Sequence, residues 1–226
     1  MRVNKGLMIA ATFDPTKRTS LITVADMCRK IEENSISLPL YQRDISWTLQ
    51  KCIDLLNYQL WGKAPVSPIS INVINTVDSA VPQVSFIDRE IISTIERGQY
   101  SVVDGQQRLT TNYKAYCNHD DFRNIVLDLG KGEFTEVRDS IRSNQIPVGI
   151  LLNKEDTKLF EYTKAKSALG SADVLSVLLQ VRSKMRNYNY TLNSAEDLTE
   201  DEQIEWFEVC LLYTSRAHET SAHLVC

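Results

Sequence analysis

The segment SVVDGQQRLTTNYKAY (residues 101–116) contains an abrupt change of pattern. An apolar run ends at Val102 and Val103, and the five residues Asp-Gly-Gln-Gln-Arg follow it directly. Apolar side chains then return at helical spacing, at Leu109, Tyr113, Tyr116 and Cys117. The segment therefore predicts a strand, a glycine-containing turn and a helix in immediate succession.

The residue types in this turn suit the binding of an anion. A strand that leads through such a turn into a helix directs backbone N–H groups and the positive end of a helix dipole at one point. Gly105 lets a ligand approach the backbone, and Arg108 offers a bidentate charged fork. Asp104 can hold Mg²⁺ or orient Arg108, while Gln106 and Gln107 can contact a ribose, a base or an attacking water. An ordinary turn, capped by Asp104 and followed by a solvated Arg108, explains the same spacing.

A second segment, LPLYQRDISW (residues 38–47), is extended and dense in functional side chains. It contains Pro39, Tyr41, Gln42, Arg43 and Trp47. A connector seldom combines aromatic rings, an amide and a guanidinium, which favours a binding role. The alternative is an edge strand with its two aromatic side chains half buried in the core.

Periodicity places further elements around these two segments. Thr23 and Thr48 are predicted caps of amphipathic helices over 24–33 and 49–60. Strands are expected at 69–75, within 83–95, at 100–103, in a hairpin over 125–137 and at 146–152, and only helices are expected from 156 onward. The pattern predicts an α+β domain to about residue 153, followed by a helical region.

Composition limits the classes of function. The chain has 226 residues, of which 43% are hydrophobic and 24% charged, so it can bury a core as one domain with or without a helical extension. Its net charge of -4 predicts no broad affinity for DNA. The apolar run over residues 6–11 is too short for a membrane span or a signal-peptide core. We therefore expect a cytoplasmic protein that does not enter a membrane.

The final stretch, CLLYTSRAHETSAHLVC (residues 210–226), has neither helical nor strand periodicity. It resembles a translated sequencing adapter, and we interpret it as a non-native tail. His218 and His223 are therefore excluded as ligands or catalytic bases, and His119 is the one histidine left. A Ser-His-Asp triad or a histidine-rich metal site is not expected.

Two groups of reactive side chains receive a structural interpretation. The cysteines before the tail are scattered and form no C-x-x-C pair, so we expect reduced thiols at Cys28, Cys52 and Cys117. The carboxylates Glu133, Glu136 and Asp139 have a spacing that suits a metal site, but a solvated face explains them better.

Together, P-x-Y-Q-R-x-x-x-W and the downstream V-V-D-G-Q-Q-R-L-T-T resemble the N-terminal domain of GmrSD-type restriction endonucleases. The order of elements agrees over residues 20 to 153. The resemblance implies a fold similar to ParB and sulfiredoxin, which is an α+β fold with a small mixed sheet and flanking helices. We expect the chain to divide into a lead-in (1–19), a ParB-like nucleotide-binding domain (20–153), a truncated helical connector (154–209) and the tail (210–226).

The resemblance also implies a function, the NTP-binding and hydrolysing sensor of a modification-dependent, type IV-like DNA restriction endonuclease in antiphage defence. The expected nucleotide-binding residues are Tyr41, Gln42, Arg43, Gly105, Gln106, Arg108 and Thr110. For hydrolysis, Arg108 would stabilise phosphoryl charge, Asp104 would hold Mg²⁺ and Gln107 would position water. The alternatives are a ParB-like switch that binds nucleotide without hydrolysis and a purely structural domain.

The expected partners follow from what this segment lacks. Full-length relatives commonly carry a His-Asn-His nuclease module, and this chain has too few histidines for such a centre. We expect DNA contact through a missing C-terminal module or a partner subunit, and a homo-oligomer is left open.

Overall fold

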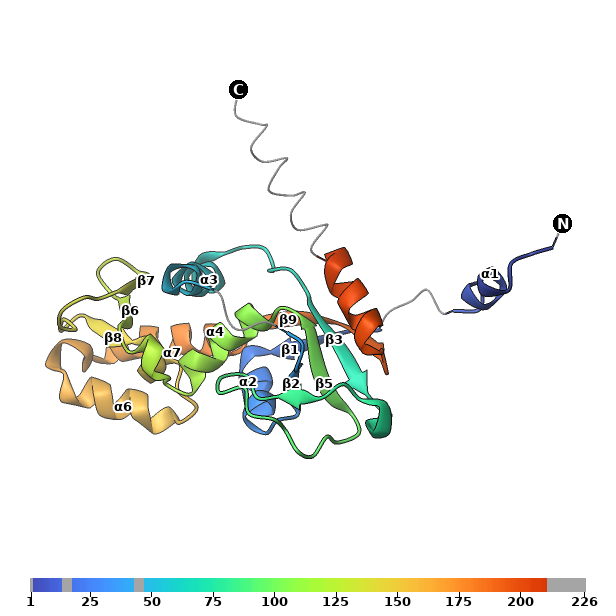
Figure 1. The fold of residues 1–226 in the computed structure, drawn as a ribbon. Coiled ribbons are helices and arrows are strands. Elements are labelled where there is room, and N and C mark those ends of the chain that lie inside the picture. The colour runs from blue at the N-terminus through green and yellow to red at the C-terminus, as the bar shows by residue number, and fades with distance from the viewer. Residues whose placement is uncertain (1, 14–17, 43–46, 211–226) are drawn as a thin grey trace, which may run out of the picture.

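The computed structural model describes residues 2–13, 18–42 and 47–210. These residues form a six-stranded sheet and a smaller three-stranded sheet, each packed against helices (Figure 1). The α+β class predicted from the sequence is therefore confirmed. Arg43 and the tail from residue 211 lie outside the described residues.

The larger sheet contains the motif strand at its centre. Its order is β1 (Arg18–Thr23), β9 (Asn189–Glu196), β3 (Ile69–Ile74), β5 (Gln99–Asp104), β2 (Ile36–Pro39) and β4 (Gln83–Val84). The pairs β2/β5 and β3/β9 are parallel, and the other pairs are antiparallel. The sheet is thus mixed, as the resemblance implied.

Helices α2 (Val24–Glu32) and α4 (Gln106–Tyr116) pack on one face of this sheet. The amphipathic pattern of α2 buries Met27, Cys28 and Ile31 against strand residues such as Ile71. The Thr23 hydroxyl accepts from the Asp26 N–H at 3.1 Å, so the predicted cap is present. Burial of these apolar side chains, at about 25 cal/mol per Å², holds α2 on the sheet.

The opposite face of the sheet carries a row of polar side chains. Strand register aligns Asn72, Ser101 and Ser37 in one row across β3, β5 and β2, and all three are buried. Residues 197–210 pack here, since the Leu198 N–H donates to Asn72 Oδ1 at 2.9 Å. A helix occupies residues 200–210 of this segment.

A second core surrounds the small sheet, whose order is β7 (Glu133–Glu136), β6 (Ile125–Asp128) and β8 (Gln145–Pro147). Helices α3 (Leu49–Trp61), α5 (Val148–Leu151), α6 (Asp156–Ala165) and α7 (Ala172–Arg186) pack around it. Ala115 of α4 belongs to this core while Leu109 belongs to the other, so α4 joins the two. The predicted hairpin at 125–137 and helix at 49–60 are confirmed.

Three predicted elements differ from the structure. Residues 146–152 were expected to form one strand, but β8 ends at Pro147 and α5 begins at once, with Leu152 N–H bonding to the Val148 carbonyl. Within 83–95, only β4 and an isolated bridge between Val84 and Ile91 form. The expectation of helices alone after residue 156 is wrong at 189–196, because Tyr190 and Leu192 alternate toward the core in β9.

The remaining elements are short. They are α1 (Lys5–Ala10), which buries none of its residues, and the 3₁₀ turns Val77–Ser79, Asp120–Phe122 and Ser167–Leu169. In the described part of the chain, no helix has the length and apolar character that a membrane span requires.

Candidate functional site

The two motif segments meet at one edge of the large sheet. Strands β2 and β5 are parallel neighbours, so the chain leaves both at the same edge. Gln42, three residues beyond β2, donates from Nε2 to the carbonyls of Val102 (2.6 Å) and Val103 (2.9 Å) of β5. The structure thus brings Gln42, with its neighbour Tyr41, to the strand that ends at Asp104 and leads into Gly105.

Both the backbone conformation and the close packing at position 105 require a glycine. It caps α4 with φ of +104°, a conformation that L side chains rarely adopt. A Cβ added there would lie 2.4 Å from Ile69 Cδ1 and 3.3 Å from Arg108 Nη2. The close packing of β3 against the turn therefore depends on the absence of a side chain.

The Arg108 guanidinium is held by the protein itself. Nη2 donates to Asp104 Oδ2 at 3.1 Å and to the Pro68 carbonyl at 3.3 Å, and Nη1 donates to the Ser67 carbonyl. The side chain of Arg108 is 13% exposed and that of Asp104 is 27% exposed. Arg108 thus fixes the loop before β3 to the motif, and Asp104 orients it.

Gln107 also makes a bond between the two motif segments. Its Oε1 accepts from the Trp47 N–H at 3.2 Å, so it ties the last residue of the segment 38–47, which we call the YQR segment, to α4. Together with Gln42 it gives two amide links between segments about sixty residues apart in sequence. This bond competes with a role for Oε1 in positioning water.

The first turn of α4 retains unsatisfied hydrogen-bonding capacity. Side chains of Thr23, Thr48 and Ser171 cap α2, α3 and α7, whereas no described side chain caps α4 or α6. Near this end, Gln106 Nε2, Thr110 Oγ1 and Gln42 Oε1 are buried and have no hydrogen-bond partner among the described residues. Gln106 is 9% exposed and Thr110 is 1% exposed. Buried polar atoms normally find hydrogen-bond partners, so these three atoms are exceptions among the described residues.

Tyr41 connects the site to the covering segment, residues 197–210. Its hydroxyl donates to Gln203 Oε1 at 3.2 Å. Burial, and next the nearby Glu200 carboxylate, raise the pKa of Tyr41 to about 12, so the hydroxyl stays a donor at physiological pH.

Two contact residues at the site were missed by sequence reasoning. Arg89 donates from Nη2 to the carbonyls of Leu40 (3.3 Å) and Gln42 (2.6 Å), which fixes the YQR segment from a loop. Gln203 accepts the hydrogen bond from the Tyr41 hydroxyl. Neither residue lies in a recognisable motif, and no local signal in the sequence identifies them.

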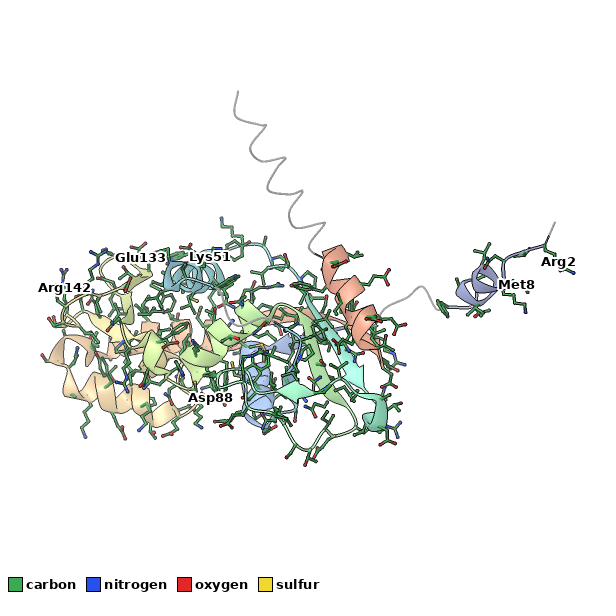
Figure 2. All side chains as sticks on the ribbon, in the orientation of Figure 1. Arg2, Met8, Lys51, Asp88, Glu133 and Arg142 are labelled. Carbon is green, nitrogen blue, oxygen red and sulfur yellow. The ribbon has the colours of Figure 1, made fainter. Side chains whose placement is uncertain are left out.

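The other candidate residues stay apart from the site. Glu133, Glu136 and Asp139 are exposed, and Glu133 lies at the outer surface beside α3 (Figure 2). Across the described ranges, no cluster of His, Cys, Asp and Glu has a geometry for a metal ion. Cys28 and Cys52 are buried free thiols and Cys117 is a partly buried one, as expected. A cavity of about 460 Å³ lies at the opposite end of β5, lined by Lys30, Arg97 and Gln99 among others, and contains no predicted site residue.

The fold and site define an α+β domain whose two signature segments converge on an uncapped helix N-terminus. Comparison with family models gives a match over residues 24–216 to the GmrSD restriction endonuclease N-terminal domain. The chain therefore belongs to this family of restriction endonuclease domains. None of the curated proteins compared with the chain matches it. The matched range extends past Cys210, into the segment interpreted above as a non-native tail, and that interpretation stays a prediction.

Proposed function

We propose that the β5–α4 junction binds the phosphate groups of a nucleoside triphosphate that carries Mg²⁺. One observation supports this most: the first turn of α4 has no side-chain cap among the described residues, and Gln106 and Thr110 bury polar atoms without partners beside it. A helix N-terminus of this kind attracts phosphate through its N–H groups and dipole. The amides of Gln42 and Gln106 can both donate and accept, as contacts with a base or ribose require.

The proposed roles follow the positions of the side chains. Binding is assigned to Tyr41, Gln42, Arg43, Gly105, Gln106, Arg108 and Thr110. Asp104 has a partly exposed carboxylate, the group that Mg²⁺ prefers, at the end of β5. When bound, the nucleotide supplies the phosphoanhydride to be hydrolysed; Arg108 would offset its charge and Gln107 would orient water.

We infer further that the chain is the NTP-sensing part of a modification-dependent restriction endonuclease in antiphage defence. Membership of the GmrSD N-terminal family supports this assignment. The net charge of -4 supports DNA contact through another module or subunit rather than through this domain.

A second candidate is a nucleotide switch that binds without hydrolysis. It is favoured by the bonds of Arg108 to Ser67, Pro68 and Asp104, which occupy the guanidinium, and by the bond from the Trp47 N–H to Gln107 Oε1. In this scheme the two residues hold the site in shape and do not act on the phosphates.

The binding step is tested by the unfolding temperature of the chain with ATP, CTP, GTP or UTP, each with and without Mg²⁺. A ligand at 100 times its dissociation constant stabilises by roughly 2.7 kcal/mol. We expect at least one nucleotide to stabilise the chain by this amount and so to raise its unfolding temperature. We expect Gln106→Leu to abolish this rise. Gln50→Leu, on the exposed side of α3, is the matched control and retains the shift. The proposal fails if no nucleotide raises the unfolding temperature.

Phosphate release then separates the two candidates. Turnover that falls by orders of magnitude in Arg108→Ala supports the hydrolase, and saturable binding with no release supports the switch. Because Arg108 also holds Ser67 and Pro68, the unfolding temperature of the variant is measured in parallel. Normal turnover in a folded Arg108→Ala protein contradicts the catalytic role.

A further inference from the structure

The covering segment, residues 197–210, is anchored to the large sheet by a dense set of bonds. The Asp197 carboxylate accepts from Asn75 N–H (2.7 Å), Thr76 N–H (2.8 Å) and Thr76 Oγ1 (3.0 Å). Thr199 and Glu202 form a capping box, with Glu202 Oε2 accepting from the Thr199 N–H at 2.9 Å. The segment therefore begins at a fixed point beside β3.

Gln203 is the side chain through which this segment contacts the motif. It is 1% exposed, and its Nε2 donates to the Leu198 carbonyl at 2.8 Å. Its Oε1 accepts from the Tyr41 hydroxyl at 3.2 Å. The buried Gln203 amide thus bonds through Nε2 within the covering segment and through Oε1 to the YQR segment.

Tyr41 is held from two directions. Its neighbour Gln42 is bonded through Nε2 to β5, which fixes the backbone beside the proposed nucleotide site. Gln203 holds the other end of Tyr41, its hydroxyl. Without Gln203, the half-buried hydroxyl would lose its acceptor, and the ring would gain freedom to leave its present rotamer.

We infer that Gln203 is a positioning residue for Tyr41, and that docking of residues 197–210 and nucleotide binding at the β5–α4 junction stabilise each other. This inference rests on the proposed nucleotide site. Because linkage is reciprocal, nucleotide binding should protect the covering segment, and weakening its bond to Tyr41 should weaken nucleotide binding. Residues 197–210 would then be docked more firmly when nucleotide is bound than when it is absent.

A double-mutant cycle in the full chain measures this coupling, with the nucleotide that gives the largest thermal shift as the ligand. The variants are Tyr41→Phe, Gln203→Leu and the double variant, and the readout is Kd by calorimetry. We expect each single change to raise Kd about five- to tenfold, the lower range for linked sites. The double variant should be no weaker than either single variant, because both remove the same bond.

Gln203→Glu distinguishes positioning from support of the fold. As a carboxylate it keeps an acceptor for the Tyr41 hydroxyl, but it loses the donor to the Leu198 carbonyl and places an unpaired charge at a buried position, which destabilises the fold. We expect a lower unfolding temperature with a nearly unchanged Kd, whereas Gln203→Leu changes both. Gln180→Leu, on the exposed face of α7, should leave Kd unaltered.

Hydrogen exchange gives the reciprocal measurement. Nucleotide should increase amide protection over residues 198–210, and this gain should disappear in Gln203→Leu, while α7 is unaffected in both. If Gln203→Leu lowers the unfolding temperature but leaves Kd and the protection unchanged, Gln203 is only structural and the inference fails while the nucleotide site stands. If the wild-type chain binds no nucleotide, both fail.

Discussion

Two turns in this molecule follow a strand that ends in aspartate, and they differ in how their polar groups are used. At the end of β6, Asp128 accepts from Gly130 N–H (2.9 Å), Lys131 N–H (3.2 Å), Asn144 Nδ2 (3.1 Å) and Gln145 Nε2 (2.7 Å). At the end of β5, Asp104 accepts from Arg108 Nη2, and buried atoms of Gln106 and Thr110 lack partners among the described residues.

The difference separates a turn whose polar groups bond to one another from the turn that we propose binds a nucleotide. In the Asp128 turn, the carboxylate accepts from two backbone N–H groups of the turn and from two amide side chains. The Asp104 turn leaves the first turn of α4 uncapped, which lowers stability in the absence of a ligand. Substitutions in the Asp128 turn should therefore change the stability of the fold, while several substitutions in the Asp104 turn should change nucleotide binding.

The largest effect is expected from Gly105→Ala. Its φ of +104° costs an L residue about 1–2 kcal/mol, and the contact with Ile69 Cδ1 at 2.4 Å adds roughly 1–3 kcal/mol of overpacking. We expect a loss of about 2–5 kcal/mol in the free energy of unfolding, measured with urea. Gly98→Ala is the control: its φ is +87°, but no atom lies within 4 Å of the added Cβ, so it should lose only the backbone term. Equal losses would show that the packing against Ile69 is unimportant.

The next largest effects on stability and binding are expected from substitution of the two aspartates. Asp128→Ala leaves the buried Gln145 amide without its acceptor, and we expect a loss of about 2 kcal/mol with nucleotide binding retained. Asp104→Ala, which removes one partly exposed ion pair, should lose less stability and should abolish the Mg²⁺-dependent part of nucleotide binding. Urea titrations and calorimetry on both variants measure the two quantities. A reversed pattern would contradict the division of roles between the turns.

The pH dependence of stability provides a separate test of the Asp128 turn. The hydrogen bond from the Gln145 side chain, helped by the N–H groups of Lys131 and Gly130, lowers the pKa of Asp128 below its ordinary value. A lowered pKa stabilises the folded state above the unfolded value of about 3.9, and this contribution is lost as pH falls through the folded pKa. The difference in urea midpoint between wild type and Asp128→Ala should be largest near pH 7 and should shrink below about pH 4. The exposed Asp139→Ala variant serves as control, and a difference that grew in acid would refute this assignment.

The sequence predicted the parts of this fold that local patterns determine. Helices α2, α3 and α4 follow from apolar spacing and from threonine or glycine at their ends, and the β6–β7 hairpin follows from its glycines. Strand β9 escaped prediction because its polar residues form a strand only through pairing with β1 and β3, distant in the chain. Local composition does not encode such pairings.

The site shows the same limit. Asp104, Gly105 and Arg108 are recognisable as a motif, and parallel pairing of β2 with β5 brings Tyr41 and Gln42 to them. The bonds of Arg108 to Ser67 and Pro68, and of Tyr41 to Gln203, join residues 40 or more positions apart. These contacts need the folded chain, and they change the roles that side-chain chemistry alone assigns.

The smallest effect is expected at two adjacent threonines, and it tests the comparison most sharply. Thr111 Oγ1 donates to the Gln107 carbonyl at 2.8 Å, whereas Thr110 Oγ1 is buried without a partner among the described residues. Thr111→Val should therefore lose roughly 0.5–1 kcal/mol of unfolding free energy, and Thr110→Val should lose none or gain slightly, because it removes an unsatisfied hydroxyl.

Nucleotide affinity should respond in the opposite order. If Thr110 is kept polar for a ligand, Thr110→Val weakens nucleotide binding severalfold while Thr111→Val leaves Kd nearly unchanged. Urea unfolding and calorimetry on this isosteric pair measure both trends. A Thr110→Val protein with wild-type affinity would mean that its buried hydroxyl does not serve the ligand, and only the unpartnered amide atoms of Gln42 and Gln106 would then support the proposed site.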